Sequence, residues 1–114
     1  MSVKLTTRQV GDVTVIDANG RITLGEGSST FRDTIKDLTA RGNKKLLLNL
    51  GEVSYIDSSG IGEMVSGFTS VTNQGGELKL LHLNKRVKDL LQITKLYTVF
   101  EVFEDEAAAV RSFS

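Results

Sequence analysis

The spacing of hydrophobic residues changes several times along the chain, and each change predicts another element of secondary structure. Apolar and polar side chains alternate through residues 3–8, and Gly11-Asp12 separates this run from a second strand-like run at 13–16. Two such runs joined by a two-residue turn are typical of a β-hairpin. The sheet is therefore predicted to open with antiparallel strands.

A helical period follows the hairpin. Phe31, Ile35 and Leu38 fall on one face of a predicted helix, with Ser28 as its cap and Gly42 as its stop. This segment has the position of a first crossover helix between parallel strands.

A nearly continuous apolar run at residues 46–50 comes next, as expected of a central strand covered on both faces, and the chain then continues to Asp57. A second helix is predicted after Asp57. Its apolar stripe is formed by Ile61, Met64, Val65, Phe68 and Val71.

The remaining chain alternates between strand and helix patterns. Residues 78–83 predict a strand, Asn84 a cap for a short helix, 99–103 a last strand and 104–112 a last helix. Such alternation favours right-handed crossovers into a mostly parallel sheet. We therefore predict an α/β fold in a single domain, residues 1–114, with a mixed, mostly parallel sheet of four to five strands and about four helices.

Composition excludes several classes of function and adds little to the prediction of the fold. The 114 residues include no cysteine, which excludes thiolate and disulfide chemistry, and no apolar stretch near 20 residues, which argues against membrane insertion. Fourteen basic residues balance fourteen acidic ones, so no overall field attracts nucleic acid. The expected location is the cytoplasm, with partners recognised locally and no direct binding of nucleic acid.

The segment Asp57-Ser58-Ser59-Gly60 is the leading candidate for chemistry. In open α/β sheets, reactive groups collect where a strand ends and a helix begins, and this segment occupies such a place. Gly60 and Gly62 are expected to leave the backbone uncovered, so that another protein can approach the serines. A phosphoryl group on Ser58 would add nearly two negative charges beside Asp57. The alternative is that Asp57 and Ser58 are ordinary helix caps.

Other functional classes have less support from the sequence. A phosphoryl-accepting role for Asp57, as in a response-regulator receiver, lacks the further acidic residues that hold Mg²⁺. A serine hydrolase lacks a Gly-x-Ser-x-Gly segment, and the only histidine, His82, belongs to a strand pattern. Solvated helix surface is the favoured interpretation for the basic residues Lys85, Arg86 and Lys88 and for Glu101, Glu104, Asp105 and Glu106. We therefore expect no catalytic residue, no cofactor and no metal.

The string from Tyr55 to Gly62, Tyr-Ile-Asp-Ser-Ser-Gly-Ile-Gly, resembles the signature loop of the STAS family, the anti-sigma factor antagonists. Further segments resemble the family in order and spacing, so that essentially the whole chain is covered. They are the leading hairpin, Gly20-Arg21-Ile22, Leu48-Asn49-Leu50, Gly75-Gly76-Glu77-Leu78 and residues 85–91.

The resemblance implies a phosphorylation switch. It implies that Ser58 accepts phosphate from an anti-sigma factor with serine kinase activity, that the unmodified protein binds this partner and releases the sigma factor, and that a metal-dependent serine phosphatase restores binding. Asp57 would then shape the loop and cap the helix. The partner-binding loop would comprise Asp57, Ser59, Gly60, Gly62, Glu63, Arg21 and Thr23.

Two features leave the partner open. Some members carry an acidic residue soon after the glycine that ends the second strand, where this sequence has Arg21 and Thr23. STAS-like domains also serve membrane transporters and other regulatory complexes as interaction modules without phosphorylation, and this remains the alternative function. The intact Asp57-Ser58-Ser59 segment favours the switch.

Overall fold

The first two strands form the predicted antiparallel hairpin. The structure is a computed structural model that describes residues 3–23 and 25–113. Strands β1 (Val3–Val10) and β2 (Val13–Ile22) pair from Val3 opposite Gly20 to Val10 opposite Val13. Gly11 turns the chain between them with a φ of +64°, in the left-handed region that glycine tolerates best.

The remaining strands run parallel to β2, as the alternating pattern predicts. The sheet has the order β1-β2-β3-β4-β5, and its last three strands are β3 (Lys45–Ile56), β4 (Glu77–Leu81) and β5 (Val102–Phe103). The helices are α1 (Glu26–Ala40), α2 (Ser58–Asn73), α3 (Lys85–Ile93) and α4 (Glu106–Ser112). The predicted α/β class, with a mixed five-stranded sheet and four α-helices in the described residues, is confirmed.

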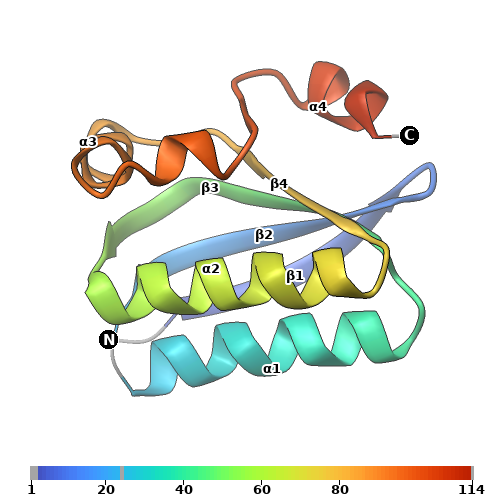
Figure 1. Ribbon diagram of the computed structural model, residues 1–114, viewed down its shortest axis with the longest axis horizontal. Helices are drawn as coiled ribbons and strands as arrows, with labels where there is room; N and C mark the ends of the chain where they lie inside the picture. The colour runs from blue at the N-terminus through green and yellow to red at the C-terminus, as the bar shows by residue number, and fades with distance from the viewer. Residues whose placement is uncertain (1–2, 24, 114) are drawn as a thin grey trace.

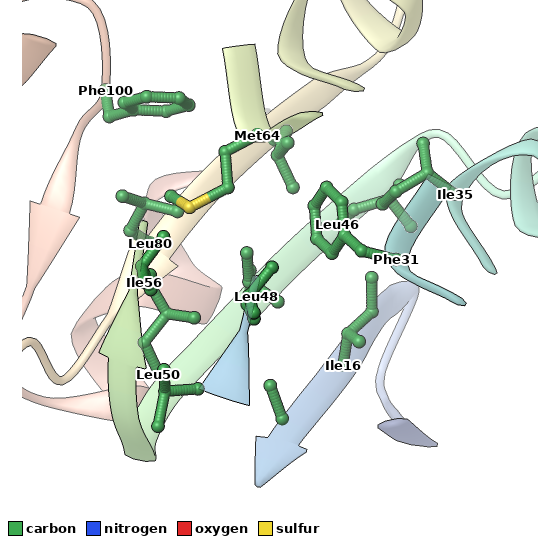
Figure 2. Close-up of a cluster of buried hydrophobic side chains, with 14 of the residues drawn as sticks. Ile16, Phe31, Ile35, Leu46, Leu48, Leu50, Ile56, Met64, Leu80 and Phe100 are labelled. Atoms are coloured by element: carbon green, nitrogen blue, oxygen red, sulfur yellow. The ribbon is translucent and has the colours of Figure 1, made fainter. Parts of the chain in front are cut away.

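Two apolar layers cover the sheet. Helices α1 and α2 lie side by side on one face, and α4 lies on the other (Figure 1). Figure 2 shows the larger core, where Phe31 and Met64 from these two helices lie over the sheet with Leu46 and Leu48. Leu47, which lies between Leu46 and Leu48 in the sequence, belongs instead to the smaller core beneath α4. The run at 46–50 is therefore covered on both faces, as its composition predicts.

Three predicted boundaries differ from the structure. The first helix begins at Glu26 and has Gly25 at its N-cap position, so Ser28 lies within the first turn and is not the cap. The strand predicted at 78–83 ends at Leu81, because the backbone of His82 has a φ of +57° and leaves the extended conformation. The strand predicted at 99–103 contains only Val102–Phe103. A 3₁₀ helix, Leu96–Thr98, precedes it and uses residues that the pattern left unassigned.

Candidate functional site

Asp57 joins β3 to α2 and organises the turn that carries Ser58. Its extended backbone places its side chain at the N-cap position, where Oδ1 accepts a hydrogen bond of 2.8 Å from the Gly60 N–H. Its own N–H donates to the carbonyl oxygen of Ile22, at 3.3 Å, which ties the turn to the end of β2. Asp57 therefore has the capping geometry expected from the sequence.

Ser58 is the first residue of α2, and its side chain is exposed. Ser59 beside it is half-buried. Among the side chains described for residues 3–23, 25 and 29–113, no hydrogen bond engages the Ser58 hydroxyl. The unpaired N–H groups of a helix begin at this end and carry a partial positive charge, which favours an anion there. The hydroxyl at position 58 is thus accessible to a modifying enzyme.

The two glycines of the turn have different environments. A Cβ atom on Gly60 would lie 2.3 Å from the carbonyl oxygen of Ile22 and 2.7 Å from Cγ2 of Ile56, so Gly60 is buried at a contact that only glycine permits. The expectation that Gly60 leaves the backbone uncovered is therefore wrong, since the ends of β2 and β3 cover it. Gly62 is exposed, and a Cβ atom there would meet nothing within 4 Å.

Parallel pairing brings the end of β2 next to the serine turn. Arg21 pairs with Tyr55 and Ile22 with Ile56 in the register of β2 and β3. Arg21 is exposed, with its Cζ 5.0 Å from the centroid of the Tyr55 ring, and Thr23 is half-buried in the loop that follows. The structure thus brings the predicted site residues of both loops together at the carboxyl ends of β2 and β3.

Glu63 lies one turn along α2 and faces the neighbouring helix. Its Oε1 is 3.6 Å from Nε of Arg32 in α1, and both side chains are partly exposed. An ion pair of this length in solvent contributes little to stability. Glu63 is therefore near the serine turn, with its carboxylate directed toward α1.

Helix α3 completes a groove beside Ser58 that the sequence did not predict. The groove has a volume of about 550 Å³. From β3 and α2 it is lined by Tyr55, Ile56, Asp57 and Ser58, and from α3 by Lys85, Arg86, Asp89, Leu90 and Ile93. Lys85 and Arg86, interpreted from the sequence as solvated surface, thus share a concave surface with the candidate phosphoacceptor.

Asn84 holds α3 in this position. Its Oδ1 caps the helix by accepting a hydrogen bond of 2.8 Å from the Val87 N–H, as predicted. Its Nδ2 also donates to the carbonyl oxygen of Val53 in β3. The second bond joins residues 31 positions apart, so only the folded chain reveals it. One side chain therefore both starts α3 and fixes it to the strand that leads to Ser58.

The acidic residues and the single histidine do not gather into a metal site in the part of the chain that the structure describes. Among the side chains of residues 3–23, 25 and 29–113, no group of three histidine, aspartate or glutamate side chains is placed to hold a metal ion. His82 is half-buried next to Gly51 and is not among the residues that line the groove. In the same described ranges, no helix is both long and apolar enough to cross a membrane.

Sequence comparisons match the chain to a domain family and to several curated relatives. The sequence model of the STAS domain matches residues 4–109. A relative in Thermotoga neapolitana is 30% identical over 102 residues, which cover 89% of each chain. Its name describes it as an anti-sigma factor antagonist and a homolog of the protein TM1081. The anti-sigma-B factor antagonist of Bacillus subtilis is 38% identical over 72 residues, which cover 63% of this chain and 65% of the relative.

Solved structures share the fold at low sequence identity. The crystal structure of TM1081 from Thermotoga maritima is 24% identical, with a TM-score of 0.89 over 96% of this chain and 93% of the other. The Bacillus protein SpoIIAA in its phosphorylated form is 19% identical, with a TM-score of 0.74 over 95% and 97%. The murine anion transporter Slc26a9 matches 91% of this chain with only 18% of its own, at 18% identity and a TM-score of 0.74.

Proposed function

The chain belongs to the STAS domain family, and we propose that it is a phosphorylation-controlled anti-sigma factor antagonist. The unmodified protein binds an anti-sigma factor that has serine kinase activity, and the sigma factor is released. The same partner phosphorylates Ser58, which ends the binding, and a serine phosphatase restores it. The chain acts in the cytoplasm as a ligand and substrate of these proteins and not as a catalyst.

The observation that carries this proposal is the exposed Ser58 hydroxyl at the first residue of α2. An attacking hydroxyl must reach the γ-phosphorus of ATP in the kinase, which requires a serine that stands at the surface. Support also comes from the relatives, because several of them are named as anti-sigma factor antagonists.

Phosphorylation at this position changes charge without requiring a change of fold. A phosphoserine carries between one and two negative charges near neutral pH. The N-terminus of α2 stabilises that charge, while the carboxylate of Asp57 repels it. Asp57 also caps the helix through Gly60, so the repulsion acts on a turn that the capping hydrogen bond and the Gly60 contact hold in place. The switch therefore changes the surface offered to the partner.

The direct test combines phosphosite mapping with binding. The purified protein is incubated with a serine-kinase anti-sigma factor from the same organism and ATP, and mass spectrometry locates the phosphate. Phosphate is expected on Ser58 and is expected to be lost in Ser58→Ala but kept in Ser59→Ala, the adjacent control. Phosphate on Thr23 or Ser66 instead would contradict the assignment.

The charge switch is tested by affinity. Ser58→Ala is expected to bind the anti-sigma factor like the unmodified protein and to remain bound in the presence of ATP. Ser58→Asp is expected to bind at least about tenfold more weakly, because its carboxylate would be buried without water in the contact with the anti-sigma factor. Equal affinity of the two variants would remove the switch from the mechanism.

The alternative is a STAS interaction module of a transporter or another regulatory complex. It has support from the fold shared with part of the transporter Slc26a9. Such a module is expected to bind its partner equally well with serine, alanine or aspartate at position 58. The same affinity series therefore separates the two functions.

A further inference from the structure

We infer that the groove between the serine turn and α3 is the docking site for an acidic segment of the anti-sigma factor that inserts one large apolar side chain. This inference rests on the function proposed above and specifies which surface and which chemistry the partner uses. Three features carry it: the apolar residues of the groove, the arginines at its Tyr55 side and the position of Ser58 in its lining.

The apolar part of the groove is unusually exposed. Ile93, at the end of α3, keeps 78% of its surface in solvent, more than any other large apolar side chain in the described residues. It lines the groove together with half-buried Leu90 and with Tyr55 and Ile56. Burying an aliphatic side chain of this size from water is favourable by about 1.5–3 kcal/mol. An apolar side chain from another protein therefore gains free energy by covering Ile93.

Two arginines lie at the Tyr55 side of the groove: Arg86 lines it, and Arg21 approaches the same ring from the end of β2. The Cζ atoms of Arg21 and Arg86 lie 5.0 and 5.7 Å from the centroid of the Tyr55 ring. Among the side chains that the structure describes (residues 3–23, 25 and 29–113), neither guanidinium group forms an ion pair with a carboxylate. Lys85, in contrast, pairs with Asp89 at 3.1 Å. Two arginines stacked near one ring and without acidic partners are suited to bidentate recognition of carboxylates.

The position of Ser58 explains why phosphorylation would release such a segment. Ser58 and Arg86 line the same groove. A phosphate dianion on Ser58 repels the carboxylates of the bound segment and also competes with them for the guanidinium group of Arg86. The phosphate thus replaces the carboxylates of the segment within the same groove, and this replacement needs no conformational change elsewhere.

Hydrogen bonds within the chain fix both walls of the groove before a partner binds. Asn84 caps α3 and donates to the carbonyl oxygen of Val53, so the α3 wall is fixed to β3. The opposite wall is fixed by the cap that Asp57 forms on Gly60. A site whose walls are ordered before binding loses less conformational entropy when the partner arrives.

The test measures the affinity of the anti-sigma factor that phosphorylates Ser58 for four variants. Ile93→Ser removes the apolar contact and Arg86→Glu reverses one charge, and each is expected to weaken binding by at least about tenfold. Lys88→Glu is the charge control, because Lys88 is exposed on α3 but does not line the groove. Val99→Ser is the apolar control, because Val99 is exposed outside it. Both controls are expected to bind within about twofold of the wild type.

The outcomes separate this inference from the proposed function. If Ser58→Asp abolishes binding while Ile93→Ser and Arg86→Glu bind like the wild type, the switch holds and the groove assignment is wrong. If Ser58→Asp and Ser58→Ala bind equally but both groove variants are weak, the groove assignment holds and the switch is wrong. Circular dichroism of each variant excludes loss of fold, which is not expected from these exposed positions.

A second copy of the chain is the competing occupant. Sedimentation of the wild type and Ile93→Ser tests this directly. A monomer in both cases is expected. A wild-type dimer that Ile93→Ser dissociates, with unchanged affinity for the anti-sigma factor, would assign the groove to self-association and overturn the inference.

Discussion

Arg8 and Arg86 both lie at the surface, but they are in regions that use their charges differently. On the α4 side of the sheet, Arg8 binds Asp17 at 2.7 Å and Glu106 at 2.5 Å, so it joins the opening hairpin to the last helix. At the groove, Arg86 lies with its Cζ 5.7 Å from the centroid of the Tyr55 ring and forms no ion pair among the described side chains. The charge of Arg8 on the α4 side is therefore used within the fold, whereas we expect the charge of Arg86 at the groove to be available to a partner.

Lys79 extends the contrast on the α4 side. It is only 4% exposed, and its Nζ donates to the carbonyl oxygen and Oγ of Ser112 at 3.0 and 2.9 Å. The same Nζ is 4.7 Å from the centroid of the Phe113 ring and 3.3 Å from Oε2 of Glu101. This buried cation therefore fastens the end of the chain to β4. Glu101 and Glu106, interpreted from the sequence as solvated charges, both take part in such contacts.

The groove end is held by close packing rather than by charge, and Gly60 gives the largest expected effect. Gly60→Val places side-chain atoms where a Cβ alone lies 2.3 Å from the carbonyl oxygen of Ile22, so α2 must move away from β2. The loss is expected to be about 3 kcal/mol or more in the free energy of unfolding, measured by urea denaturation.

Gly62 provides the matched control. Gly62→Val meets open space and is expected to change stability by less than about 1 kcal/mol, while its branched side chain weakens binding of the anti-sigma factor. Equal destabilisation by the two substitutions would show that the close contact of Gly60 with β2 and β3 does not stabilise the groove end of the molecule.

Lys79 gives the next largest effect. Lys79→Ala leaves a cavity and removes the donor to Ser112, so the expected loss is about 3 kcal/mol in the free energy of unfolding. Lys85→Ala is the control, because the side chain of Lys85 is 89% exposed and its ion pair is on the surface. Its expected effect is within about 0.5 kcal/mol. Similar values for the two lysines would break the distinction between the two regions.

The sequence predicts local features of both regions well. The Gly11-Asp12 turn, the doubly covered strand and the caps formed by Asp57 and Asn84 each depend on residues close together in the chain. The two features that define the groove depend on distant contacts, namely the bond from Asn84 to Val53 and the approach of Ile22 to Gly60. No periodicity records such contacts, so the sequence predicts the helix after Asn84 but assigns its basic residues Lys85, Arg86 and Lys88 to solvated surface.

The failed prediction at the last strand has a local cause. Residues 99–103 have strand-like composition, but the backbone of Lys95 has a φ of +61° and directs the chain into the 3₁₀ helix Leu96–Thr98. A left-handed conformation at a lysine is uncommon, so its position could not be read from residue preferences. Phe100 then enters the larger core, and only two residues remain to pair with β4.

Arg8 gives a smaller effect that depends on pH. Its hydrogen bonds lower the pKa of Asp17 and of Glu106 below their ordinary values of 3.8 and 4.5. A lowered pKa means that the folded state binds the proton more weakly, so the stabilisation is present above these values and is lost as pH falls through the lowered ones. The wild type is therefore expected to lose stability below about pH 4.5.

Arg8→Met tests this linkage. At pH 7 the variant is expected to be less stable by about 1 kcal/mol, because both ion pairs are partly exposed to solvent. The difference from the wild type is expected to shrink as pH falls toward 3, measured by urea denaturation at each pH. A difference that stays constant with pH would show that Arg8 acts through packing of its aliphatic stem and not through its charge.

The smallest effect on stability is expected at Arg86, and it completes the comparison with Arg8. Arg86→Met removes a guanidinium group that forms no ion pair among the described side chains, so the free energy of unfolding is expected to change by no more than about 0.5 kcal/mol at any pH between 3 and 7. Its association rate with the anti-sigma factor is expected to fall, and that rate is expected to depend less on salt than in the wild type, since a charge that steers the encounter is gone. Stopped-flow measurements at two salt concentrations check both statements. If Arg86→Met were as destabilising as Arg8→Met, the guanidinium at the groove would already be committed to the fold, and no charge there would be free for a partner.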